Sequence, residues 1–307
     1  MPELYIRPER VTDYPRIEDL HIRAFGNRFD EAALVALLRT RSAYDNRLAL
    51  VAEKEGLLVG HVLFNPMSLY WQGETLQAVN LAPIAVHPDF QGSGIGGQLI
   101  IVGHTIARDK GYDFAFLLGH TDYYPRFGYR TGAYGDSALT VRVADVPAQS
   151  EALTTASLMP ADLMTLAALH HANEKQVSLS PQIAPELALW LSPHPGIPAT
   201  VYRQQGQIIG YTRGAADNLR HFLAVDDASA QAIVHHIADE RETLTLPLHP
   251  QSARADAFST PATVEAWGAA MICPLQTPAV IDRYLQALAT DGTVGRVLWP
   301  SVFDIAG

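Results

Sequence analysis

The sequence contains a single cysteine, Cys273, among its 307 residues. One cysteine excludes an intramolecular disulfide and any metal site built from several cysteines, and it suits a reducing compartment. The sequence also lacks an apolar run of about 18 residues and an N-terminal leader with a basic head, so it predicts neither a membrane span nor a signal peptide. We therefore expect a cytoplasmic protein that has no metal ion and no membrane partner.

Basic residues are scarce, with 22 Lys and Arg against 32 Asp and Glu, and the formal net charge is −10. A chain of this charge binds nucleic acid poorly by simple electrostatics, so no nucleic-acid partner is expected. A cationic substrate would suit the negative charge, although net charge bears mainly on solubility.

Several sequence signals of other enzyme classes are missing. The chain has no Gly-Lys-Ser/Thr and no Gly-x-Ser-x-Gly, which leaves a P-loop and a hydrolase nucleophile elbow without support. The adjacent pairs His170-His171 and His235-His236 fall on expected helices, where neighbours point about 100° apart and make poor metal sites. Cys273 lies in an apolar run and is expected to be a small buried hydrophobe.

The first half of the chain predicts a sheet with helices around it. Apolar residues recur at helical spacing from Ile17 to Phe25, and strands are expected at 4–8, 47–53, 57–70, 77–86, 114–118 and 139–143. Short glycine turns join the second, third and fourth of these into an antiparallel meander, with a break expected near Asn65-Pro66. The apolar run 114–118 is typical of a buried strand with a parallel neighbour. The expected fold class is α+β, with a mixed, mostly antiparallel sheet and flanking helices.

The second half repeats part of the first. Residues 201–211 match residues 51–61 at a constant offset (201 − 51 = 206 − 56 = 210 − 60 = 150), and 223–225 match 84–86 (225 − 86 = 139). The segment 145–157 has no periodicity and predicts a linker. We expect a duplicated, tandem fold with domains at 1–148 and 149–307.

A glycine-rich segment, Gln91 to Gly97, precedes a helix expected over 94–110. Such loops let backbone N–H groups converge on a phosphate, and the helix adds its positive N-terminal end. Gly92, Gly94 and Gly97 also satisfy Gly-x-Gly-x-x-Gly, which would indicate a nucleotide-dependent oxidoreductase. That fingerprint follows a first parallel strand almost at once, whereas here an antiparallel meander and residues 87–91 come before it.

The same segment fits a second phosphate motif, Gln/Arg-x-x-Gly-x-Gly/Ala, and two neighbouring stretches extend the match. Over about residues 4–145 the chain resembles the GNAT superfamily of N-acetyltransferases. Three stretches carry the resemblance: Ala82-Pro83-Ile84-Ala85-Val86-His87-Pro88-Asp89-Phe90, Gln91-Gly92-Ser93-Gly94-Ile95-Gly96, and the Tyr-x-x-x-Gly-aromatic pattern Tyr124 to Tyr129. The expected domain 149–307 resembles a degenerate second copy, a layout similar to that of the enhanced-intracellular-survival acetyltransferases. At its loop equivalent Asp226 and Asp227 would oppose a phosphate, so no cofactor is expected there.

The resemblance implies an acetyl-CoA-dependent N-acetyltransferase, in which an amine attacks the thioester directly. It implies that coenzyme A contacts Ile84, Ala85, Val86, Gln91, Gly92, Ser93, Gly94, Ile95, Gly96 and Gly97. The Val86 N–H is then the donor to the thioester carbonyl. Tyr124 is the acid that protonates the leaving thiolate, as a phenol with a pKa near 10 is able to do, and Tyr123 is the adjacent competitor.

The sequence leaves open which group deprotonates the amine. His120, at the end of the strand 114–118, has a suitable intrinsic pKa. On this reading Asp122 and Asn80 lie near it, and His61 lies on the third strand. The survival-type resemblance implies that the terminal carboxylate, here on Gly307, enters the site if the strand near Trp299 reaches the first domain. A non-catalytic acyl-CoA sensor is an alternative function, against which Tyr124 argues. The acceptor, a small-molecule or peptide amine, and the oligomeric state are not specified.

Overall fold

A computed structural model of the chain describes residues 3–71, 74–148, 152–276, 278–291 and 294–305. Its strands are β1 (Tyr5–Pro8), β2 (Ala49–Lys54), β3 (Leu57–Trp71), β4 (Glu74–Val86), β5 (Phe114–Leu118), β6 (Tyr134–Arg142), β7 (Thr154–Ser157), β8 (Ala199–Gln204), β9 (Gln207–Arg213), β10 (His221–Ala224), β11 (Thr243–Leu246), β12 (Thr263–Ala266), β13 (Ala270–Pro274) and β14 (Gly295–Arg296). Its α-helices are α1 (Tyr14–Ala24), α2 (Asp30–Arg39), α3 (Ile95–Asp109), α4 (Leu163–Glu174), α5 (Asp227–Ala238) and α6 (Pro278–Asp291). Among the helices of these ranges, none has the length and apolar character needed to cross a bilayer.

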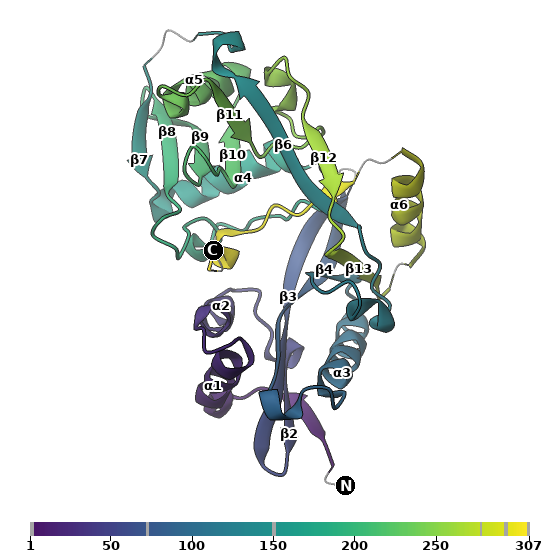
Figure 1. Cartoon of the computed structure of the whole chain (residues 1–307). Coiled ribbons are helices and arrows are strands. Elements are labelled where there is room, and N and C mark those ends of the chain that lie inside the picture. The colour runs from purple at the N-terminus through teal and green to yellow at the C-terminus, as the bar shows by residue number, and fades with distance from the viewer. Residues whose placement is uncertain (1–2, 72–73, 149–151, 277, 292–293, 306–307) are drawn as a thin grey trace.

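The first sheet has the strand order β1-β2-β3-β4-β5-β13. The predicted meander is confirmed, since β2, β3 and β4 pair in antiparallel fashion, and β5 is the predicted parallel neighbour of β4. Helices α1 and α2 cover one side of this sheet and α3 covers the other (Figure 1). The antiparallel strand β13 on the far edge of β5 comes from the second half of the chain and was not predicted.

The predicted break at Asn65-Pro66 is wrong, because β3 runs through it without interruption. The irregularity lies instead between Val62 and Phe64, opposite the step from Leu81 to Ile84 on β4. The Pro66 carbonyl accepts a hydrogen bond from Arg41 at 3.3 Å, so the backbone of Pro66 faces the edge of β3 beyond the end of β2. A proline is tolerated there because no ladder hydrogen bond is lost.

The duplicated hairpin is confirmed in detail. Glu55 and Gly56 turn from β2 to β3 with φ of 53° and 77°, and Gln205 and Gly206 turn from β8 to β9 with φ of 49° and 80°. Both hairpins also carry a register shift at the same place, after Ala52 and after Tyr202. The later part of the match is shifted by one residue from the prediction, because Ala224 pairs with Gly210 as Val86 pairs with Gly60 (224 − 86 = 138).

The two halves of the chain are interleaved rather than simply consecutive. Strands β7 to β10 form a second sheet, and β6 pairs with β11, β12 and β14 in a third. The predicted linker therefore includes a strand, β7, and β13 returns to the first sheet. The division at 148/149 stays a prediction, and in this topology it does not separate one sheet from the next.

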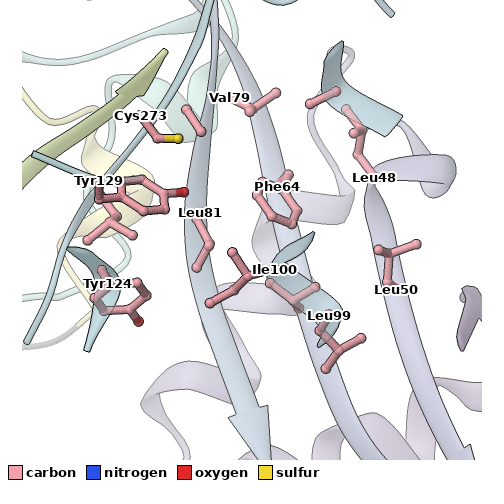
Figure 2. Packing of buried hydrophobic residues seen from close by; sticks show 14 of the residues in the cluster. Leu48, Leu50, Phe64, Val79, Leu81, Leu99, Ile100, Tyr124, Tyr129 and Cys273 are labelled. Atoms are coloured by element: carbon pink, nitrogen blue, oxygen red, sulfur yellow. The ribbon is translucent and has the colours of Figure 1, made fainter. Parts of the chain in front are cut away.

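Helix α3 packs closely on the first sheet, and a buried apolar cluster lies between them (Figure 2). Two glycines allow this approach. A Cβ on Gly60 would lie 2.9 Å from both Ile95 and Leu99, and a Cβ on Gly103 would lie 2.0 Å from the Phe64 ring. The position of the N-terminal end of α3 over β3 and β4 is thus fixed by core packing.

Six buried histidines have pKa values below the ordinary 6.5: His21, His61, His104, His170, His221 and His249. Burial is the largest cause in each case, because the charged imidazolium loses its hydration. The unfolded chain binds protons at these sites below about pH 6.5, whereas the folded chain does so only at lower pH. Folding stability is therefore lost as the pH falls below about 6.5.

We expect the free energy of unfolding, measured by urea denaturation, to decrease between about pH 6.5 and about pH 5. His104, whose pKa is lowered to about 4, accounts for roughly 2 kcal/mol of that decrease. In His104→Gln the dependence on pH should be shallower by this amount, even if the absolute stability is lower. A protein equally stable at both pH values would contradict the prediction.

Candidate functional site

Strands β4 and β5 pair over a short distance and then separate. Their register consists of Ala78 with Phe114, Val79 with Ala115 and Asn80 with Phe116. At the last pair the Asn80 side chain donates from Nδ2 to the Phe116 carbonyl at 3.2 Å. Beyond this point β4 continues to Val86 opposite β3, and among the described residues no strand pairs with its other edge.

The edge of β4 that faces away from β3 carries free backbone groups. His87 donates its N–H to Val59 on β3 at 2.9 Å. Hydrogen bonding alternates along an antiparallel strand, so the N–H groups of Val86 and Ile84 point the other way, toward the side of β5. Gln91 Nε2 donates to the Val86 carbonyl at 3.2 Å, which agrees with this direction.

The glycine loop leads from this edge into α3. Gly92 and Gly94 have φ of 76° and 85°, a left-handed conformation that favours glycine, and a Cβ at either would meet nothing within 4 Å. Gln98 donates to the Gly94 carbonyl at 3.1 Å, so the N–H groups of the first helical turn precede the intrahelical ladder. Residues 91–94 are exposed. Free amides at the positive end of a helix form the expected binding site for a phosphate.

The remaining loop glycines have a different physical role from the one that the sequence suggested. A Cβ on Gly96 would lie 2.8 Å from the Tyr123 hydroxyl, and a Cβ on Gly97 would lie 2.9 Å from Phe127. These two positions require glycine because the short helix η4 (Tyr124–Phe127) and the residue before it pack against the start of α3. The glycine loop and η4 are therefore one packed unit.

Tyr124 opens η4 and is buried, with 8% of its surface exposed. Its ring lies against Gly119, where a Cβ would come within 2.3 Å of Cε2, and beside Tyr129 in the cluster of Figure 2. Burial, with a smaller contribution from Tyr123, raises the pKa of Tyr124 to about 12. The phenol is thus protonated at neutral pH and can act as a proton donor.

The candidate bases lie in different places. His120 is exposed just beyond β5, and Asp122 is exposed on the following turn. His61 is fully buried on the side of α1, where His21 contacts its Nδ1 at 2.8 Å and Glu9 contacts its Nε2 at 3.0 Å. Because both ring nitrogens are engaged, His61 is a structural residue. Asn80 lies at the point where β4 and β5 separate.

The partner of His61 belongs to a buried network that sequence reasoning missed. Burial raises the pKa of Glu9, but hydrogen bonds from His61 and Arg39 outweigh it, and the net pKa is lowered to about 2. Tyr44 also donates to this carboxylate, at 2.5 Å. The four residues come from three separate parts of the sequence and carry no common motif, so no local signal indicated the network.

The C-terminal segment reaches the first sheet, as the survival-type resemblance required. The Trp299 ring stacks on Phe116 of β5 with ring centroids 5.9 Å apart, and the Trp299 carbonyl accepts from Arg213 at 2.6 Å. Asp304 pairs with Arg213 at 3.2 Å and with Arg220 at 3.0 Å. Gly307 itself lies outside the described residues.

The second copy has its own anion at the equivalent helix end. The Asp226 side chain accepts a hydrogen bond from the Ser229 N–H of α5 at 2.8 Å, and this bond lowers the pKa of the carboxyl. The Ser229 N–H, which would otherwise be available to a phosphate, is therefore already bonded. That this half binds no cofactor stays a prediction, and the occupied N–H group is a physical reason for it.

Comparisons with known proteins agree with this geometry. The family model of the acetyltransferase (GNAT) domain matches residues 5–132. The uncharacterized N-acetyltransferase YjhQ of Escherichia coli K12 is 36% identical over 155 residues, which are 50% of this chain and 84% of the relative. YhbS, an uncharacterized N-acetyltransferase of the same strain, is 37% identical over 134 residues, 43% of this chain and 77% of the relative.

Two solved structures match nearly the whole chain. A GCN5-related N-acetyltransferase from Kribbella flavida has a TM-score of 0.68 at 20% identity, and the match covers 91% of this chain and 72% of the Kribbella chain. Eis1 from Mycobacterium abscessus has a TM-score of 0.62 at 18% identity, with coverage of 90% and 75%. At these identities the likeness concerns the fold, and it extends through the second half of the chain.

The loop geometry predicts the effect of Gly94→Ala. An alanine at φ of 85° is strained by about 1–2 kcal/mol, so the loop should relax away from the conformation that presents its amides. We expect the affinity for coenzyme A, measured by calorimetry, to fall by about tenfold. Gly206→Ala is the matched control, because it has a φ of 80° and open space but lies in the β8–β9 turn. Equal affinities in the two variants would refute the assignment of the loop.

Proposed function

Because this chain belongs to the GNAT family of N-acetyltransferases, we propose that it transfers the acetyl group of acetyl-CoA to a primary amine by direct attack on the thioester. One observation carries the proposal. The edge of β4 at Ile84 and Val86 that faces away from β3 leads toward the exposed residues 91–94 and the first turn of α3. An extended ligand with a phosphate at one end would meet backbone N–H groups of β4 and then, beyond residues 87–91, those at the start of α3.

Each part of the site would serve one part of the cosubstrate. The loop amides, followed by the N-terminal end of α3, would hold the diphosphate. Backbone groups of Ile84, Ala85 and Val86 would hold the pantetheine arm, with the Val86 N–H donating to the thioester carbonyl as negative charge develops there. The Ile84 N–H points the same way and is the other available donor.

The chemistry then needs one proton removed and one supplied. The amine nitrogen bonds to the acyl carbon, the carbon–sulfur bond breaks, and the departing thiolate takes the proton of the Tyr124 hydroxyl. Acetyl-CoA supplies the activated acyl carbon. The exposed imidazole of His120 would take the amine proton, directly or through water.

The competing functions receive unequal support. An oxidoreductase fingerprint would follow a parallel strand, but β4 reaches the loop as the last strand of an antiparallel meander. A non-catalytic sensor would bind acyl-CoA equally well. It would not need a buried, protonated tyrosine packed beside the loop, and this observation favours an enzyme.

A turnover assay decides between the enzyme and the sensor. We expect free thiol to be released from acetyl-CoA when the protein is incubated with a panel of primary amines that spans alkyl, aromatic, amino-sugar and peptide acceptors. Mass spectrometry should find one added acetyl group on the acceptor. Tight binding of coenzyme A without acetylation of any amine in the panel would favour the sensor.

The position of Tyr124 predicts the effect of Tyr124→Phe. Removal of the hydroxyl should lower kcat by about 100-fold, because loss of a general acid typically costs that much, while the affinity for coenzyme A stays unchanged. Tyr123→Phe is the matched control, because its ring touches Tyr124 but its hydroxyl lies over Gly96. We expect this second variant to keep kcat within about threefold. If it showed the larger loss instead, the two tyrosines would exchange roles.

A further inference from the structure

The side chain of Asn80 has an unused hydrogen-bond acceptor. The residue is 1% exposed, and its Oδ1 has no partner among the described residues. A buried polar atom without a partner destabilises the fold, so such atoms are rare and call for an explanation. This one lies on the last pair of β4 and β5, beside the proposed position of the reacting thioester.

The orientation of the amide follows from its surroundings. Nδ2 faces the Phe116 carbonyl at 3.2 Å, and a carbonyl requires a donor, so the oxygen is the atom that is left free. Asn65, opposite Asn80 on β3, cannot supply a donor from Nδ2, which is already shared between the carbonyls of Asn80 and Ala82. Neither the Phe116 carbonyl nor the Asn65 amide therefore donates to Oδ1.

The face of the sheet decides which ligand Oδ1 can meet. Asn80 lies on the same face as its register partner Phe116, whereas its neighbours Val79 and Leu81 point into the cluster under α3 that also contains Tyr124. Asn80 and Tyr124 are thus on opposite faces of the sheet. The thioester would lie between β4 and β5, so an amine that approaches it from the face opposite Tyr124 comes to the side on which Asn80 lies.

We propose that Asn80 Oδ1 accepts a hydrogen bond from the N–H of the acceptor amine and directs the nitrogen lone pair toward the acyl carbon. This inference rests on the proposed acetyl transfer. An amide does not titrate, so Asn80 binds and orients the amine and leaves its deprotonation to another group. A primary amine suits this role, because one N–H can bind Oδ1 while the other remains for proton transfer.

Two variants test the proposal in opposite directions. Asn80→Leu has a similar size but no acceptor, and we expect kcat/KM for the amine to fall by about 10- to 100-fold with the affinity for coenzyme A unchanged. Asn80→Asp keeps an oxygen toward the amine but loses the donor to Phe116, so it should retain acceptor affinity. If Asn80 only braced the two strands, the aspartate variant would lose as much as the leucine variant.

A ligand comparison covers the case in which a variant is unstable. In the parent protein the best amine acceptor found in the turnover assay should bind more tightly than its carbon isostere, which has CH3 in place of NH2. In Asn80→Leu that preference should disappear, and Asn65→Leu, which removes a neighbouring structural amide, should preserve it. A preference unchanged in Asn80→Leu would overturn the inference. A parent protein that acetylates no amine would instead refute the proposed function.

Discussion

The separation of β4 from β5 is the constraint on which the rest of the site depends. A strand inside a sheet normally fills its hydrogen bonds on both edges, and an edge left open must be satisfied by water or a ligand. Here pairing stops after Asn80, yet β4 continues as far as Val86 with its other edge bound to β3. Backbone donors and acceptors are thereby aligned without any side chain having to be placed.

The second requirement is that an anion site and a proton donor lie at fixed positions relative to this open edge. Gly60 and Gly103 bring α3 close to the sheet, so its N-terminal end cannot shift along β4. Gly96 and Gly97 then bring η4 against the same helix end, which places Tyr124 in the buried cluster. Core packing, rather than loop contacts, sets the distances within the site.

The second half of the chain completes the first rather than merely following it. Strand β13 covers the far edge of β5, and Trp299 lies on Phe116, on the face where Asn80 is found. The buried pairing of Asp304 with Arg213 holds the segment that carries this tryptophan. At the start of α5 the Asp226 carboxylate already binds a backbone N–H, and this half of the chain supplies the contacts that hold Trp299 and β13 against the first sheet.

The sequence by itself determined the features that depend on local chemistry. Turn glycines, helical periodicity and the loop spacing identified the meander, the repeated hairpin and the loop 91–97, because such signals act over a few residues. The role expected of Tyr124 came from the resemblance to the family. Only the tertiary structure decided that β13 joins the first sheet, that His61 is enclosed by Glu9, and that Asn80 keeps an unpaired oxygen. These outcomes depend on strands and side chains brought together from distant positions, and no short sequence pattern encodes which partner a buried group will find.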